Sequence, residues 1–175
     1  YIDLSDIKNN VYSSVSHNSK IAYLPDKLTE DLAFILGAYY SDGSIRDYNN
    51  KGKATYGIAW TEKDQDRFNL INNCLKTVFH VDCAKNVNIC LNGKIYLEFF
   101  KALGSNRYSR NKNIPACILQ SPVSVIINFI RGMFFDTHHF SNHGFIFTNG
   151  NDSSIYEISN LLYHFGIFAD IRKSC

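Results

Sequence analysis

Two aspartates, Asp42 and Asp136, lie at the carboxyl-terminal ends of two long apolar stretches of the 175-residue sequence. The first stretch is LTEDLAFILGAYYSDG, residues 28–43, and the second is IINFIRGMFFDTHHF, residues 126–140. Carboxylates at the ends of two paired helices repel one another unless a cation lies between them, and hard oxygen ligands suit Mg²⁺. Ions held in this way stabilise the attacking and leaving oxygens of a phosphodiester during hydrolysis. The two acids therefore indicate metal-dependent phosphoryl chemistry if the fold brings them together.

Both apolar stretches have the pattern of buried helices. Thr29 is a typical N-cap, residues 32–40 are apolar nearly all round, and Gly43 is typical of a helix end. Pro122 suits the first turn of a second helix over residues 123–135. We expect both helices to be buried against each other, because the small residues near Gly37 would let two backbones approach closely.

The order of predicted elements after the first apolar helix recurs after the second. Two strands, an amphipathic helix and a further strand follow in each case, and Gly37 and Gly132 are 95 residues apart. In the first half the predicted elements are strands at residues 44–48 and 54–60, a helix from Thr61 to Phe79, strands at 81–85 and 87–91, and a short helix that ends at Gly104. In the second half they are a hairpin around residues 142–144, a helix from Asp152 or Ser153 to Gly166, and a terminal strand at 167–175.

The repeated order predicts an α+β fold built as a pseudo-twofold duplication of αββαββα units, with the second unit truncated at its C-terminal end. We assign residues 1–27, which are rich in Asn, Ser and Asp, to a linker or loosely attached lead-in segment. Residues 28–121 form the first repeat and a basic connector, and residues 122–175 form the second, incomplete repeat.

A twofold pair of hairpins matches the antiparallel symmetry of duplex DNA, and β-ribbons can enter the major groove. The basic connector needs no strand register for a phosphate contact, whereas a slip of one residue in a hairpin would reverse which side chains face DNA. The predicted DNA contacts are Arg46, Lys51, Lys53, Tyr56, Trp60, Lys85, Asn86, Arg107, Arg110, His139, Asn142 and His143. We read His138 and His139 as solvated or DNA-contacting, because adjacent histidines point in different directions and rarely share one metal ion.

Composition limits the other classes of function. A net charge of +2 gives no overall signal for nucleic acid, so any basic surface must be local. The five cysteines form no CxxC pair, which argues against a disulfide framework or a zinc site and favours a reducing, intracellular compartment. No apolar run approaches the length of a membrane span, and no signal peptide opens the chain. Because the chain begins at Tyr1, we expect it to be excised from a larger host protein.

The same residues resemble a known family. ILGAYYSDG, residues 35–43, is similar to the LAGLIDADG motif, SPVSVIINFIRGMFFDTHH resembles its second copy, and NKNIPACILQSP resembles the K-x-IP segment between them in intein-type, dodecapeptide homing endonucleases. The resemblance covers residues 28–175. It implies a monomer with internal pseudo-symmetry that cuts a long double-stranded DNA target with Mg²⁺. It also implies catalytic and metal-binding roles for Asp42 with Gly43, and a basic residue near the scissile phosphates at Lys112.

The second motif departs from the family pattern. Counting five residues from the glycine gives Asp42 in the first motif but Thr137 in the second, and Asp136 falls one position early. One reading is a one-residue distortion such as a π-bulge, which would bring Asp136 to the metal as a second catalytic ligand. The other reading is loss of that ligand.

Three hypotheses follow for the function. The first is a site-specific DNA endonuclease in which Asp42, Asp136 and Lys112 act on the phosphodiester. The second is a catalytically degenerate relative that binds DNA, or binds RNA as maturases do. The third is a structural domain inside a host protein, such as the remains of an intein insert. Intein splicing residues are absent from both ends of this sequence, so any splicing chemistry lies outside it.

Overall fold

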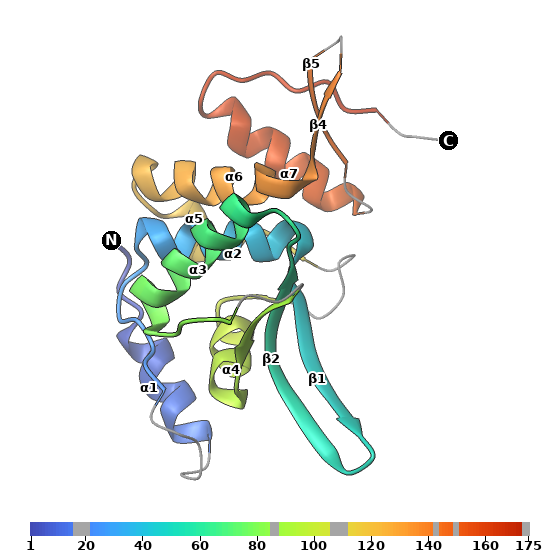
Figure 1. Cartoon of the computed structure of the whole chain (residues 1–175). Coiled ribbons are helices and arrows are strands. Elements are labelled where there is room, and N and C mark those ends of the chain that lie inside the picture. Colours follow the sequence, from blue (N-terminus) through green and yellow to red (C-terminus); the bar gives the residue numbers. More distant parts are fainter. Residues whose placement is uncertain (16–21, 85–87, 106–111, 142–143, 149–150, 173–175) are drawn as a thin grey trace.

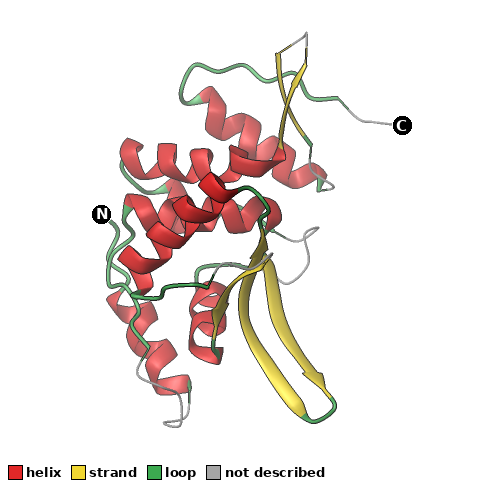
Figure 2. Cartoon of the chain, viewed as in Figure 1, coloured by secondary structure: helices red, strands yellow, loops and turns green. Residues whose placement is uncertain are grey.

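The protein has a mixed α+β fold (Figures 1 and 2). The computed structural model describes residues 1–15, 22–84, 88–105, 112–141, 144–148 and 151–172, and for residues 136–141 and 144–145 it describes the backbone alone. Its elements are α1 (Ser5–Ser14), α2 (Glu30–Asp42), β1 (Ser44–Asn50), β2 (Lys53–Thr61), α3 (Gln65–Phe79), β3 (Asn88–Asn92), α4 (Lys94–Ala102), α5 (Ala116–Leu119), α6 (Val123–Thr137), β4 (His138–Ser141), β5 (Gly144–Phe147) and α7 (Asp152–Tyr163).

The two apolar helices α2 and α6 pack against each other at the centre of the molecule (Figure 1). A methyl group on Gly37 would overlap the carbonyl oxygen of Phe129, and a methyl group on Gly132 would overlap the carbonyl oxygen of Phe34. Each glycine therefore lies against the backbone of the opposite helix, at the carbonyl three residues before the other glycine. The predicted pairing of two buried helices is confirmed.

Aromatic contacts on either side of the glycines repeat the same symmetry. The rings of Phe34 and Phe135 are 5.3 Å apart, and those of Tyr40 and Phe129 are 5.8 Å apart, both edge to face. Phe34 and Phe129 are 95 residues apart in the sequence, and so are Tyr40 and Phe135. The α2–α6 contact is thus reciprocal around Gly37 and Gly132.

Helix α2 begins and ends where its sequence predicts. The side chain of Thr29 accepts a hydrogen bond from the Leu32 N–H at 3.3 Å, which caps the first turn. At the other end the Gly43 N–H donates to the Tyr39 carbonyl at 3.0 Å and the backbone then turns into β1. Strand β1 thus leaves directly from the end of the helix that carries Asp42.

Strands β1, β2 and β3 form one antiparallel sheet in that order. The predicted hairpin is confirmed, whereas the predicted strand at 81–85 is absent from residues 81–84, and residue 85 lies outside the described part of the chain. The buried Asn72 of α3 accounts for the difference. Its side chain accepts from the Cys83 N–H at 2.8 Å and donates to Asp82 at 3.0 Å, so this segment bonds to α3 instead of to a strand.

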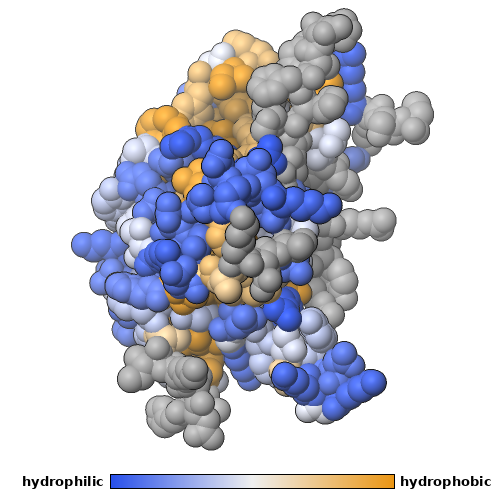
Figure 3. Space-filling view, viewed as in Figure 1, coloured by the Kyte–Doolittle hydropathy of each residue, from blue (hydrophilic) through white to orange (hydrophobic). Residues whose placement is uncertain are grey.

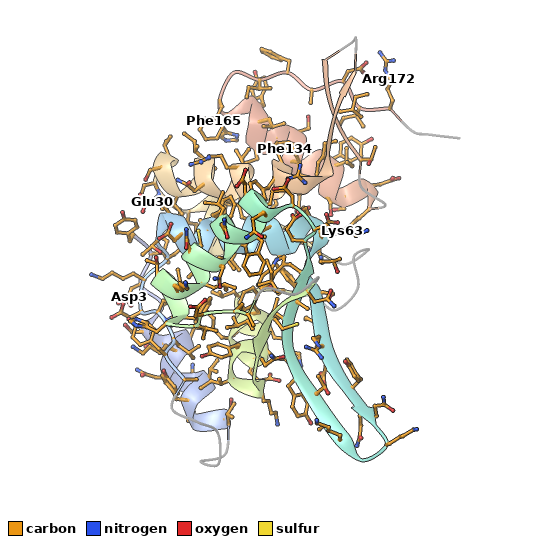
Figure 4. All side chains as sticks on the ribbon, in the orientation of Figure 1. Asp3, Glu30, Lys63, Phe134, Phe165 and Arg172 are labelled. Atoms are coloured by element: carbon orange, nitrogen blue, oxygen red, sulfur yellow. The ribbon has the colours of Figure 1, made fainter. Side chains whose placement is uncertain are left out.

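The core fills the space between α2, α3, α4 and one face of the sheet (Figure 4). Ile58 and Trp60 of β2 lie on the same face of the strand and are buried, as are Phe99 and Phe100 of α4. Phe100 packs edge to face on Tyr39 with ring centres 5.5 Å apart. Helix α4 therefore joins the sheet to the end of α2.

The N-terminal segment is packed on this core, so the prediction of a linker or loosely attached lead-in at residues 1–27 is wrong for the part that the structure describes. Helix α1 contacts α4, and Leu4 and Leu24 are buried. The Leu4 N–H donates to the Asp26 carbonyl at 2.7 Å, and the Leu28 N–H donates to the Ile2 carbonyl at 2.9 Å. The apolar residues of this segment are scattered among polar ones, so the sequence did not predict that the segment packs on the core.

The second half is smaller. Its predicted hairpin is confirmed as β4 and β5, and its amphipathic helix is confirmed as α7, capped by Asn151. The predicted terminal strand is absent from residues 167–172. No helix in the described part of the chain is long and apolar enough to cross a membrane.

The outward side of α6 differs from the equivalent side of α2. Val123 and Ile127 are 60% and 41% exposed, whereas Leu28 and Leu32, 95 residues earlier, are completely buried. Figure 3 shows apolar surface in this part of the molecule. The first half covers its central helix, and α6 keeps an apolar side open to solvent.

Candidate functional site

A small pocket of about 10 Å³, enough for one water molecule, lies at the carboxyl-terminal end of α2. Four elements meet there, because the α2–α6 contact, the end of β2 and the middle of α3 converge on the same point. The lining residues are Ala38, Ser41 and Asp42 of α2, Trp60, Thr61 and Glu62 at the end of β2, Ile71 of α3, and Gly132 and Phe135 of α6. Asp42 thus lies beside the helix pair, as the sequence predicts.

Asp42 is the last residue of α2 and its side chain is exposed. The carboxyl-terminal end of a helix carries partial negative charge, so an aspartate there is electrostatically unfavourable without a cation nearby. The ammonium of Lys112 supplies such a cation, because the negative charge of Asp42 acts to raise the pKa of that lysine.

Glu62 is a second carboxylate of the pocket, and the sequence analysis did not identify it. Glu62 is only 8% exposed, and its Oε1 accepts a hydrogen bond from the Asp64 N–H at 2.8 Å. Asp64 in turn caps α3 through bonds from the Asp66 and Arg67 N–H groups. The sequence TEKDQD is typical of a helix start, so its pattern did not predict that Glu62, at the exit of β2, lines the same pocket as Asp42. Lys63, which follows it, is labelled in Figure 4.

The end of α6 decides between the two readings of the second motif. The helix is α-helical from Val123 to Thr137, so the one-residue distortion that would bring Asp136 into register with Asp42 is absent from the backbone. Thr137 is the last helical residue and stands 95 positions after Asp42. The prediction that Asp136 is shifted to the equivalent of Asp42 is therefore wrong, and the side chain of Asp136 lies outside the described atoms.

Lys112 is buried at the end of α2 and does not point to solvent. Its ammonium donates to the carbonyl oxygens of Tyr39 at 2.7 Å, Gly43 at 2.6 Å and Tyr40 at 3.4 Å, and the residue is 5% exposed. Burial lowers the pKa of Lys112 to about 8, and the negative charge of Asp42 opposes that shift. The predicted role of Lys112 at the scissile phosphates does not fit this location.

The Gly43 carbonyl is the acceptor of the shortest of these bonds, at 2.6 Å from the ammonium. A metal ion on the same oxygen would lie beside a cation and would be repelled. The prediction of Gly43 as a metal ligand is therefore not supported by the geometry, and Asp42 and Glu62 are the acidic residues among those that line the pocket.

The residues present fit a hard cation in part. Two carboxylates line one pocket, and oxygen ligands of this type suit Mg²⁺, which keeps several waters in most protein sites. The indole N–H of Trp60, another lining residue, is buried and has no hydrogen-bond partner among the described residues. No group of three or more potential metal-ligating side chains occurs within the described ranges.

The sheet presents a polar face on the side away from the core. Arg46 donates to the Asn92 side chain at 3.0 Å, to the Cys90 sulfur at 3.2 Å and to the Tyr48 hydroxyl at 3.3 Å. Farther along, Thr61 donates to Asn88 at 3.0 Å. These contacts hold Arg46 in a fixed position on the open face, beside the exit of β2.

The strand register sorts the predicted DNA contacts of the first hairpin. Arg46 pairs with Gly57 and Asn50 pairs with Lys53, so Arg46 and Lys53 share the polar face, and Lys51 lies in the exposed turn. Trp60 alternates with these positions and is 2% exposed in the core, so its prediction as a DNA contact is wrong. Tyr56 lies on the same face as Trp60, and the ammonium of Lys94 is 5.9 Å from its ring centre. The prediction of Tyr56 as a DNA contact is therefore wrong as well.

The other predicted contacts have no described side chain. Lys85, Asn86, Arg107, Arg110, Asn142 and His143 lie outside the described residues. His139 is in β4 and pairs with Ile146, and only its backbone is described. The candidate nucleic-acid surface therefore rests on Arg46, Lys51 and Lys53.

Comparisons with known proteins add no assignment: no protein-family model matches the chain, and no curated protein matches it significantly.

Proposed function

We propose that the protein is a LAGLIDADG-type homing endonuclease, a Mg²⁺-dependent, site-specific enzyme that hydrolyses phosphodiester bonds in double-stranded DNA. The single observation that supports it most is the reciprocal α2–α6 contact, in which Gly37 and Gly132 lie on each other's helix at a spacing of 95 residues. Two helices paired in this way are what a twofold duplication requires, and a twofold axis suits a DNA duplex. The proposal includes a monomer with internal pseudo-symmetry that was excised from a larger host protein, in a reducing compartment.

The pocket supports the chemistry of this proposal. Asp42 and Glu62 would hold the cation, which would activate a water and neutralise charge on the phosphate. Asp42 takes the position of the family's first metal-binding aspartate. Glu62 is fixed by its bond from Asp64, so it would orient the water or the ion without a change of rotamer.

The open face of the sheet supports DNA as the partner. Arg46 is held by three side chains and points its guanidinium along a polar face, where an arginine can read guanine in the major groove. Lys51 and Lys53 at the tip of the hairpin would contact phosphates.

A second candidate function is a degenerate binder of DNA or RNA that does not cut. It is favoured by one observation, which is that the α-helical backbone of α6 leaves Thr137 instead of an acid at the position equivalent to Asp42. A site with one aspartate at the two equivalent positions would nick one strand at most. The remaining candidate, a purely structural domain in a host protein, predicts no binding to nucleic acid.

A selection from random DNA duplexes tests the three candidates. The purified protein is incubated with the pool in Mg²⁺, and nicked, cut and bound fractions are recovered and sequenced. Enrichment of one nicked or cut sequence supports the endonuclease, and clean double-strand cutting overturns the single-strand expectation. Sequence-specific binding without cleavage supports the degenerate binder. No salt-dependent binding to the duplex pool or to single-stranded RNA supports the structural domain.

A further inference from the structure

Lys112 is engaged by the end of α2 through all of its hydrogen-bond donors. An ammonium has three N–H groups, and the side chain meets three carbonyl oxygens, those of Tyr39, Gly43 and Tyr40. The last carbonyls of a helix have no partners within it, so this lysine supplies the missing donors. The face of the Tyr39 ring, 4.5 Å from the ammonium, adds a cation–π contact.

This arrangement leaves Lys112 no reach to a phosphate. The residue is 5% exposed and would have to break two short bonds to carbonyls, at 2.6 and 2.7 Å, before it could turn outward. The Gly43 carbonyl would then lose this donor, and the Tyr39 carbonyl would keep only its bond from the Gly43 N–H, which costs more than a surface lysine could recover from one phosphate.

The backbone of Lys112 is held from the other side by α7. Its carbonyl oxygen accepts from the hydroxyl of Ser154 at 2.7 Å and from the Asn151 side chain at 3.5 Å. Ser154 is completely buried, and two residues along the connector the Ile114 N–H donates to Glu157 of α7 at 3.0 Å. One residue therefore joins the end of the first central helix to the beginning of the last helix.

We propose that Lys112 is a positioning residue that fixes the end of α2, and with it the direction of the Asp42 carboxylate in the pocket, and that α7 acts on the site through this lysine. The inference deepens the proposed function, because the positioned group is the proposed metal ligand, and it rests on that function only where metal binding is concerned. Asp42 follows Tyr39 and Tyr40 and precedes Gly43, so the three carbonyls that Lys112 holds enclose it in the chain.

The test uses the full chain with Lys112→Met, which keeps the length of the side chain and removes its donors. The matched control is Lys101→Met, because Lys101 is a half-exposed lysine on α4 with salt bridges to Asp47 and Glu98. Three quantities are measured: amide hydrogen exchange at Gly43, Mn²⁺ affinity by spin-resonance titration, and the salt dependence of binding to random DNA duplexes.

We expect Lys112→Met to speed exchange at Gly43 by about tenfold and to weaken Mn²⁺ binding by about tenfold, with the DNA salt slope unchanged. A lysine that contacts a phosphate would instead reduce the salt slope by about one and leave exchange at Gly43 unchanged, and that result overturns the proposal. Lys101→Met should alter neither exchange at Gly43 nor Mn²⁺ affinity. An equal effect of Lys101→Met on both would also overturn it.

A second variant protects the test against misfolding. If Lys112→Met does not fold, Ser154→Ala tests the proposal instead. This substitution removes the hydrogen bond from Ser154 to the Lys112 carbonyl and leaves the ammonium in place. Faster exchange at Gly43 in Ser154→Ala supports the link from α7, and unchanged exchange overturns it. If the wild type binds neither Mn²⁺ nor DNA, the proposed function fails, and exchange at Gly43 still decides whether Lys112 holds the end of α2.

Discussion

Gly37 and Gly132 each lie on the backbone of the other's helix, against the carbonyl oxygens of Phe129 and Phe34 respectively. The contact leaves no room for a side chain on either helix. It is also the geometric origin of the candidate site, because it brings the end of α2 beside α6 and the exit of β2.

We expect Gly37→Ala and Gly132→Ala each to lower the free energy of unfolding by about 2 kcal/mol, although alanine favours a helix by about 1 kcal/mol. The added methyl group overlaps backbone atoms, which cannot rotate away. Urea unfolding measures the loss, with Asn73→Ala on the exposed side of α3 as the control. A Gly132→Ala protein as stable as the wild type would show that the helices can separate at no cost.

Asp42→Asn should abolish metal-dependent strand cutting, with a loss of at least about a thousandfold, because the amide cannot hold the cation as a carboxylate does. Without metal the variant should change stability by less than about 1 kcal/mol, since it removes both an unfavourable charge at the end of α2 and a favourable charge near the Lys112 ammonium. Cleavage of the selected duplex and thermal unfolding in chelator give the two values. Undiminished cutting would rule out Asp42 as a ligand.

Glu62→Gln keeps an oxygen for the Asp64 N–H, so α3 should remain capped and stability should change by less than about 1 kcal/mol. Mn²⁺ affinity should nevertheless fall by about tenfold, because one carboxylate of the pocket is lost. Spin-resonance titration of Mn²⁺ measures the affinity, and Glu98→Gln on α4 is the matched control. If both variants bind Mn²⁺ as the wild type does, Glu62 serves only the helix start.

The pKa of Lys112 predicts how stability depends on pH. Burial lowers this pKa from 10.5 to about 8, so between those values the unfolded chain holds a proton that the folded chain has released. Stability should therefore rise with pH from about 8 to 10.5, by about 2 to 3 kcal/mol in total. Comparison with Lys112→Met in chelator isolates this contribution, because the pKa of Tyr40, raised by burial to about 12, affects both proteins alike. Parallel pH curves for the two proteins would contradict the prediction.

Arg46→Ala should weaken binding to the preferred duplex by about 1 to 3 kcal/mol and relax sequence preference at one position, because its guanidinium is held on the open face of the sheet. Tyr56→Phe, on the opposite face of the same hairpin, is the control and should leave binding unchanged. Mobility shifts at several salt concentrations measure both. Uniform weakening on all sequences would assign Arg46 to phosphate contact.

The central helices and the first hairpin were predictable from local patterns. Thr29 and Pro122 mark helix starts, and the alternation of β2 with Gly52 in its turn marks a hairpin. Such signals lie within a few residues of each other along the chain. They also predict the pairing of α2 with α6, since an apolar helix with a central glycine needs a close neighbour.

Features that depend on distant contacts were not predictable in this way. The end of segment 81–84 is set by Asn72, ten residues earlier, and the packing of α1 is set by α4, about ninety residues later. Glu62 joins the pocket only because β2 ends beside α2, and Trp60 faces the core because of its register. Lys112 was assigned by the motif that surrounds it, whereas its location is determined by the free carbonyls at the end of α2.

The exposed apolar side of α6 bears on self-association of the protein at high concentration. Val123 and Ile127 expose aliphatic side chains to water over one face of a helix. Apolar patches of this kind lower solubility and favour self-association as molecules crowd together. We therefore expect self-association in concentrated samples to occur through this side of α6 and not through the acids of the pocket.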